Sequence, residues 1–135
     1  MTLCPDLDVE IVEERPRAAE VIELFAAARL NGPLDDEPRV QAMIDTAQHL
    51  LVARRGGGLV GLIRVLTDFA YNAFIADLAV HPDVQRTGVG SALVERAVRD
   101  FDGVKFVVHA GHGSTPFWLR QGFEPAECVV RPRRY

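Results

Sequence analysis

The sequence predicts an α+β protein with a mixed, mainly antiparallel sheet and helices on both of its faces. Three observations indicate this class. Strand-like patterns recur along the chain, and three of them follow one another in its middle. Helical patterns separate the first strand from this group and follow the group. The 135 residues contain no linker, repeat or low-complexity segment, so we expect one domain over residues 1–135.

The N-terminal third is expected to form a strand and two helices. Asp8 to Glu13 alternates between polar and apolar residues, which predicts the first strand. Apolar residues at helical spacing predict a helix over Arg17 to Leu30. Asn31-Gly32-Pro33 ends it, because glycine and proline do not readily continue a helix. A second helix is expected from about Pro38 to Ala47.

Three strands are expected next. His49 to Arg54 and Leu59 to Asp68 flank Arg55-Gly56-Gly57-Gly58, a glycine-rich sequence typical of a hairpin turn. The following strand is expected over Ala73 to Val80, after the short connection 69–72.

The C-terminal third is expected to alternate between helix and strand. Helical spacing over 93–101 predicts a helix that Asp102-Gly103 ends. Val104 to Ala110 is nearly continuous in apolar residues and predicts a short buried strand. A short helix over Ser114 to Gln121 and one or two strands over Phe123 to Arg131 complete the order.

Composition and charge exclude several classes of protein. The net charge of −4 makes nucleic acid an improbable partner, and no apolar run approaches the roughly 20 residues of a membrane-spanning helix. The first residues show no export signal, and only two cysteines are present, so we expect a cytoplasmic protein. Residues 1–50 hold 11 Asp and Glu against 4 Arg, and residues 51–135 hold 8 against 11 Lys and Arg. This asymmetry suits a cationic substrate and a phosphorylated cofactor, or it is merely uneven surface charge.

The most informative motif is Gln85-Arg86-Thr87-Gly88-Val89-Gly90, which joins the strand over 73–80 to the helix that follows. The first N–H groups of a helix lack partners and carry partial positive charge, so phosphate groups bind there. The motif lacks the third glycine of a dinucleotide-binding turn, and no Walker loop occurs in the chain.

In this setting the motif resembles the acetyl-CoA motif of the GNAT superfamily of N-acetyltransferases. Phe117-Trp118-Leu119-Arg120-Gln121-Gly122-Phe123 resembles that family's Phe-Tyr-x-x-x-Gly-Phe segment, and the element order is similar over nearly the whole chain. The resemblance implies a GNAT-like fold that transfers the acetyl group of acetyl-CoA directly to a primary amine, without a metal. It leaves open a small-molecule or protein acceptor, and a monomer or homodimer.

The resemblance also implies that the strand over 73–80 splays from the strand over 104–110. The cofactor would lie in the resulting cleft and reach the motif. Backbone groups of the strand over 73–80 would bind pantetheine and stabilise the oxyanion that develops during acetyl transfer. N–H groups of the motif would bind the pyrophosphate. The cofactor residues implied in this way are Leu78, Ala79, Val80, Gln85, Arg86, Thr87, Gly88, Val89, Gly90, Ser91, Ser114 and Phe117. The Arg86 side chain either binds phosphate or is a solvated loop residue.

The identity of the general base is open. Many members of the family carry a glutamate where this chain has Ala76, so Asp77 is the nearest carboxylate. Desolvation would make Asp77 a better base, although it is as readily a residue that holds a loop or caps a neighbour. His109 and His112 are the alternative bases, because an imidazole titrates near neutrality. Their spacing lacks the further ligands of a metal site, so no metal is expected.

The general acid is where the sequence departs from the family. Trp118 stands in place of the family's tyrosine and Gly111 in place of a frequent asparagine. An indole N–H donates a hydrogen bond but does not release its proton, so Trp118 can only steady the departing sulfur or pack beside it. Alternatively, the thiolate is released to solvent without an acid, or Tyr71 or Tyr135 serves as the general acid. A non-catalytic acyl-CoA-binding module is therefore the second functional hypothesis, and a domain without any cofactor is the third.

Overall fold

The computed structural model describes residues 2–4, 8–111 and 113–134, and its described strands form one six-stranded sheet. The strands are β1 (Thr2–Cys4), β2 (Val9–Glu13), β3 (His49–Arg55), β4 (Gly58–Thr67), β5 (Asn72–Val80) and β6 (Lys105–Val108). The helices are α1 (Ala18–Ala28), α2 (Glu37–Thr46), the 3-10 turn η2 (Pro82–Val84), α3 (Val89–Arg99) and α4 (Thr115–Arg120).

The sheet is mixed and mainly antiparallel, as expected. The strands lie in the order of the chain, and only β5 and β6 pair in parallel. The β3–β4 hairpin turns at Gly56 and Gly57, whose φ angles of 56° and 85° suit glycine. The register of β4 and β5 shifts between Arg64 and Val65, so that Ala76 is the extra residue of a bulge in β5.

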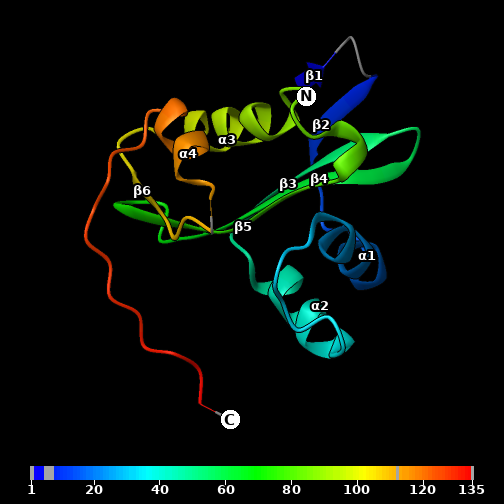
Figure 1. Ribbon diagram of the computed structural model, residues 1–135, viewed down its shortest axis with the longest axis horizontal. Helices are drawn as coiled ribbons and strands as arrows, with labels where there is room; N and C mark the ends of the chain where they lie inside the picture. Colours follow the sequence, from blue (N-terminus) through cyan, green and yellow to red (C-terminus); the bar gives the residue numbers. More distant parts are fainter. Residues whose placement is uncertain (1, 5–7, 112, 135) are drawn as a thin grey trace.

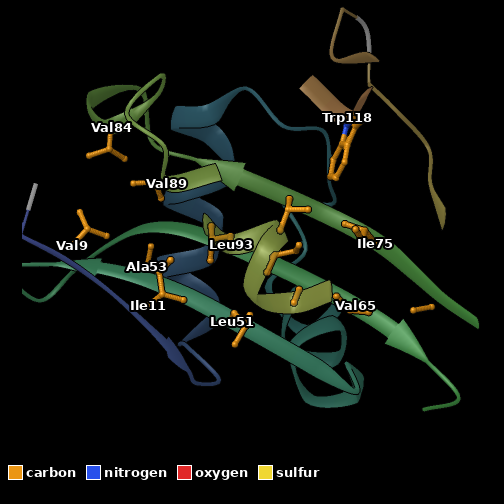
Figure 2. Packing of buried hydrophobic residues seen from close by; sticks show 14 residues of the cluster. Val9, Ile11, Leu51, Ala53, Val65, Ile75, Val84, Val89, Leu93 and Trp118 are labelled. Carbon is orange, nitrogen blue, oxygen red and sulfur yellow. The ribbon is translucent and has the colours of Figure 1, made fainter. Parts of the chain in front are cut away.

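Helices cover both faces of the sheet, so each face has its own hydrophobic cluster. Figure 1 shows α3 and α4 on one face and α1 and α2 on the other. Alternate residues of the strands point to opposite faces, which is why Ile63 and Leu62 belong to different clusters. Figure 2 shows the cluster to which α3 contributes, with Leu93 near its centre and Trp118 at one end.

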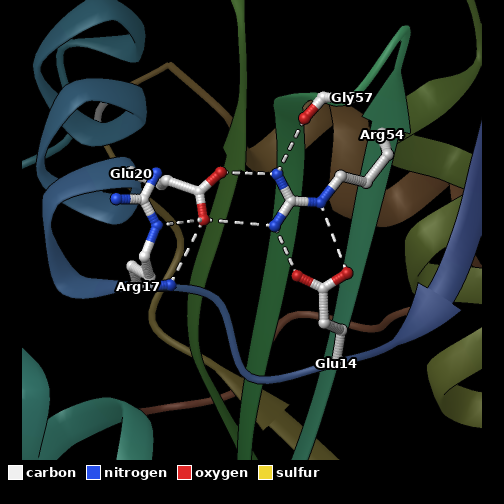
Figure 3. Close-up of polar contacts among 5 residues, drawn as sticks. All are labelled: Glu14, Arg17, Glu20, Arg54 and Gly57. Carbon is white, nitrogen blue, oxygen red and sulfur yellow. Dashed lines mark hydrogen bonds and ion pairs between the residues drawn. The ribbon is translucent and has the colours of Figure 1, made fainter.

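An ion cluster fastens α1 to the sheet. Arg54 of β3 binds Glu14, and its Nη1 donates to Glu20 Oε2 at 2.5 Å and to the Gly57 carbonyl at 3.1 Å (Figure 3). The Arg17 backbone N–H also donates to Glu20 Oε1, at 3.3 Å. The bond from Arg54 is the main reason that the pKa of Glu20 lies below its usual value, and the two glutamates raise the pKa of Arg54.

The structure corrects the sequence expectations at three places. β1 pairs with β2 although its three residues carry too short a pattern to predict. β6 is half-exposed rather than buried, because it is the last strand of the described sheet and has one uncovered face. The strands expected over Phe123 to Arg131 are absent from the described segment 121–134, where the backbone has no sheet partner. No described helix is long and apolar enough to span a membrane.

Candidate active site

The connection from β5 to α3 has the geometry of an anion-binding loop. Arg86 and Gly88 adopt positive φ angles of 63° and 97°, which turn the chain into the helix. Thr87 Oγ1 donates to the Val84 carbonyl, and Gln85 Nε2 donates to the Val80 carbonyl at 2.9 Å. These two side chains therefore brace the loop, and the Gln85 backbone N–H donates to the Pro82 carbonyl at 3.3 Å.

The first backbone N–H groups of α3 have no hydrogen-bond acceptor within the helix. Its first intrahelical bond runs from the Ala92 N–H to the Gly88 carbonyl, so the N–H groups of Val89, Gly90 and Ser91 have no partner inside the helix. A side chain at Gly90 would meet Val80 at 3.5 Å and Phe117 at 3.6 Å. Those distances place Phe117 of α4 directly beside the loop, together with the end of β5.

A fork between β5 and β6 opens beside this loop. The two strands pair only from Asn72 with Lys105 to Ile75 with Val108, after which β5 continues to Val80 without β6. The bulge at Ala76 lies at the point of divergence. Leu78, Ala79 and Val80 thus lie on the free part of β5 and follow one another toward the loop.

Asp77 is engaged in an ion pair at this fork. Arg64 Nε of β4 donates to Asp77 Oδ2 at 2.6 Å, and the two side chains are only 14% and 11% exposed. Asp77 lies on the same face as Ala79, which packs in the α1–α2 cluster. The pair can orient the carboxylate toward a substrate on that face, and it also gives Asp77 a structural partner.

Among the described residues, His109 is the other proposed base that lies next to the fork. His109 is exposed and follows Val108, the last residue of β6 that pairs with β5. Tyr71 is 72% exposed and precedes β5, at the end of the strand away from the loop. His112 and Tyr135 lie outside the described residues.

Trp118 is part of the core rather than a free side chain. It is only 6% exposed and contacts Phe117 and Phe123 with ring centroids at 5.1 and 5.2 Å. Ser114 also has a local partner, since its Oγ donates to the Gly111 carbonyl at 2.8 Å. Trp118 thus holds α4 against the core, and the Ser114 hydrogen bond fixes the turn that precedes α4.

The Ser91 hydroxyl links α3 to α4. Gln121 Nε2 donates to Ser91 Oγ at 2.9 Å across the two helices. The Ser91 side chain thus joins the helices, and its backbone N–H remains the group suited to an anion.

Two polar residues were missed by sequence reasoning because their partners come from distant strands. Arg64 meets Asp77 only through the β4–β5 register, which the local pattern does not specify. His49 is 6% exposed, and its Nε2 lies 3.2 Å from Asp100 Oδ2 at the end of α3. The ring of Phe101 contacts His49 edge-on at 4.8 Å.

Asp36, which precedes α2, has a local structural role. Asp36 is the N-cap of α2, and its side chain accepts a hydrogen bond from the Arg39 N–H at 3.1 Å. The Asp36 side chain therefore acts as the helix cap of α2.

Comparison with known proteins agrees with this geometry. A family model described as an acetyltransferase (GNAT) domain matches residues 21–131. A mycothiol acetyltransferase of Mycolicibacterium vanbaalenii is 29% identical over 123 residues, which make up 91% of this chain and 37% of that protein. The chain therefore spans little more than a third of the length of this curated relative.

Solved structures share the fold over almost the whole chain. A probable acetyltransferase of Staphylococcus aureus has a TM-score of 0.82 at 19% identity, covering 94% of this chain and 99% of that one. A GNAT family acetyltransferase of Streptococcus pneumoniae has a TM-score of 0.76 at 25% identity, with coverages of 94% and 99%.

Proposed function

Because this chain belongs to the GNAT acetyltransferase family, we propose that it transfers the acetyl group of acetyl-CoA to a primary amine. The observation that carries the proposal is the fork between β5 and β6, which opens directly onto the braced loop before α3. An extended ligand with a phosphate group at one end fits this pairing of a free strand edge with a helix N-terminus.

The loop and the fork have separate roles in this proposal. The N–H groups from Arg86 to Ser91 bind the pyrophosphate, since the Gln85 N–H donates to the Pro82 carbonyl, and Phe117 beside Gly90 is an apolar wall. Backbone groups of Leu78 and Val80 hold the pantetheine arm along the free part of β5. The N–H of Leu78 donates to the oxyanion that develops during transfer, because the bond from the His81 N–H to the Val60 carbonyl sets the Ala79 N–H toward β4. Acetyl-CoA supplies the reactive thioester.

Asp77 is the base in this proposal, and Arg64 orients it. Asp77→Asn removes the proton acceptor but retains an oxygen that can accept from Arg64. We expect turnover to fall by about 100-fold with nearly unchanged acetyl-CoA affinity. Asp83→Asn is the matched control, because the Asp83 side chain is 80% exposed in η2. Full activity of Asp77→Asn in steady-state kinetics would leave His109 or solvent as the proton acceptor.

The activity itself is tested by release of free CoA. The protein is incubated with acetyl-CoA and a panel of small amines and peptides, and the new thiol is detected with a chromogenic reagent. Amine-dependent release is expected. Binding of acetyl-CoA without release for any amine would contradict the proposed transfer.

A second candidate function is a non-catalytic acyl-CoA-binding module of the same fold. Two observations favour it: the Asp77 carboxylate already has Arg64 as its partner, and Trp118 packs in the core where the family places a tyrosine. Both candidates predict that acetyl-CoA binds, so calorimetry does not separate them. Amine-dependent turnover does.

A further inference from the structure

The side chain of His81 holds the short turn η2, which comes directly before the loop at the start of α3. Its Nδ1 accepts a hydrogen bond from the Asp83 N–H at 3.1 Å and so caps the N-terminal end of η2. The backbone N–H of His81 donates to the Val60 carbonyl of β4 at 2.8 Å, and its carbonyl accepts from the Val84 N–H at 3.0 Å. His81 therefore links η2 to the sheet, and its ring is part of the turn.

η2 in turn sets the position of the loop to which we assign the pyrophosphate. Val84, the last residue of η2, is fully buried in the cluster to which α3 contributes (Figure 2). Its carbonyl accepts the hydrogen bond from Thr87 Oγ1, and the Pro82 carbonyl accepts from the Gln85 N–H. The loop thus starts from a turn that is held by core packing at Val84 and by the ring of His81.

The bond to the Asp83 N–H specifies the protonation state of this ring. A ring nitrogen that accepts a hydrogen bond carries no proton, so the neutral imidazole of His81 has its proton on Nε2. A protonated imidazole donates from both nitrogens and accepts from neither, so it cannot cap η2. Its partner would instead be Asp83 Oδ2, which lies 3.7 Å from Nδ1. The carboxylate takes no part in the cap itself, because that bond comes from the backbone.

The charges around the ring come from the turn and the loop. Among the described residues, Asp83 is the acidic one that lies within 4 Å of a nitrogen of the His81 ring. β4 contacts His81 through the uncharged Val60, and the first six residues of α3 are uncharged as well, so Arg86 is the other charged residue between β5 and Glu95. The His81 side chain is 33% exposed and can exchange its proton with solvent.

We propose that His81 is a positioning residue of the loop before α3, and that its neutral form supports acetyl-CoA binding whereas its protonation weakens it. This inference rests on the proposed function, because it concerns the same loop. An imidazole titrates near neutrality, so the effect is expected between about pH 5 and 8. Because such coupling is reciprocal, binding of acetyl-CoA then releases protons from His81.

Two variants at this position separate the cap from the titration. The Oδ1 of His81→Asn can accept from the Asp83 N–H and does not titrate, whereas His81→Ala lacks an acceptor. At pH 8 the asparagine variant should bind acetyl-CoA like the wild type, and the alanine variant about fivefold more weakly. At pH 5.5 the wild type should bind as weakly as the alanine variant, and the asparagine variant about fivefold more tightly than both.

Isothermal titration calorimetry measures these affinities, and circular dichroism checks that each variant is folded. Phosphate groups of the ligand also titrate near pH 6, so the proteins are compared with one another at each pH. Calorimetry at pH 6.5 in two buffers of different ionisation enthalpy counts the protons released. The wild type should release more protons on binding than His81→Asn does.

The tautomer of His81 is measured without any ligand. Nitrogen-15 NMR of the imidazole at pH 8 should place the proton on Nε2. A proton on Nδ1, or the same pH dependence of affinity in the wild type and His81→Asn, would overturn this inference and leave the proposed acetyl transfer intact. A wild type that does not bind acetyl-CoA at pH 8 would instead contradict the proposed function, and with it the role of His81 in binding.

Discussion

Gly88 shows how one backbone angle shapes the loop before α3. Its φ of 97° is strained for any residue with a Cβ, although a Cβ there would meet no atom within 4 Å. The glycine is thus needed for the turn itself, and crowding within the protein is not the reason.

Gly88→Ala should weaken acetyl-CoA binding by about tenfold in calorimetry, because straightening the turn reorients the N–H groups of the loop. Gly103→Ala is the control, since Gly103 has a φ of 76° and open space but follows the C-terminal end of α3, whereas the loop precedes its N-terminal end. Both variants should lose about 1 kcal/mol of stability. Equal affinity of the two variants would argue against the loop as the pyrophosphate site.

At the scale of elements, the ion cluster around Arg54 decides how firmly α1 is held. Glu20→Gln should lower the free energy of unfolding by about 1 to 2 kcal/mol at neutral pH, because the partly buried Arg54 guanidinium loses an ionised partner. Glu23→Gln on the same helix is the control, since Glu23 is exposed. Urea denaturation of the three proteins measures the difference.

The same cluster gives a pH dependence with a defined sign. The folded-state pKa of Glu20 lies below its unfolded value, so its contribution is complete above the usual glutamate range and is lost as the pH falls through the folded pKa. The stability gap between wild type and Glu20→Gln should therefore close in acid. A gap that stays constant below about pH 3 would contradict the assigned ion pair.

The packing of α3 on the hairpin β3–β4 depends on the absence of one side chain. A Cβ at Gly61 would lie 3.0 Å from that of Ala53 and 3.1 Å from Leu93 Cδ1. Gly61→Ala should therefore destabilise the protein by about 1 to 3 kcal/mol through overpacking. Gly58→Ala in the same strand is the control, because a Cβ there would meet only the Arg55 carbonyl, at 3.4 Å. It should leave the thermal stability nearly unchanged.

For the whole molecule, a ligand that bridges the fork and α3 should stabilise the folded state. At a concentration of 100 times its Kd, acetyl-CoA should add about 2.7 kcal/mol and raise the Tm by several degrees. Differential scanning calorimetry measures this shift, and Gly88→Ala should show a smaller one at the same concentration. An unchanged Tm would favour a domain without the cofactor.

The sequence predicted the molecule where local patterns decide the structure. The helices and the strands β2 to β6 follow periodic runs, and the loop at Gln85–Gly90 follows from its residue types. The partners of Asp77 and His49 could not be predicted, because they depend on strand register and helix docking. The segment over 123–131 has a strand-like composition, but a strand also needs a neighbour for its backbone groups.

The fork between β5 and β6 also has a consequence for exchange of backbone hydrogens with solvent. Beyond Ile75, β5 retains β4 on one side only, so those of its N–H groups that face the fork should exchange faster than those facing β4. A ligand lying along β5 would slow these amides selectively and leave the rest of the strand unchanged. Amide exchange resolved by residue could thus trace the path of the ligand along the strand before any acceptor is known.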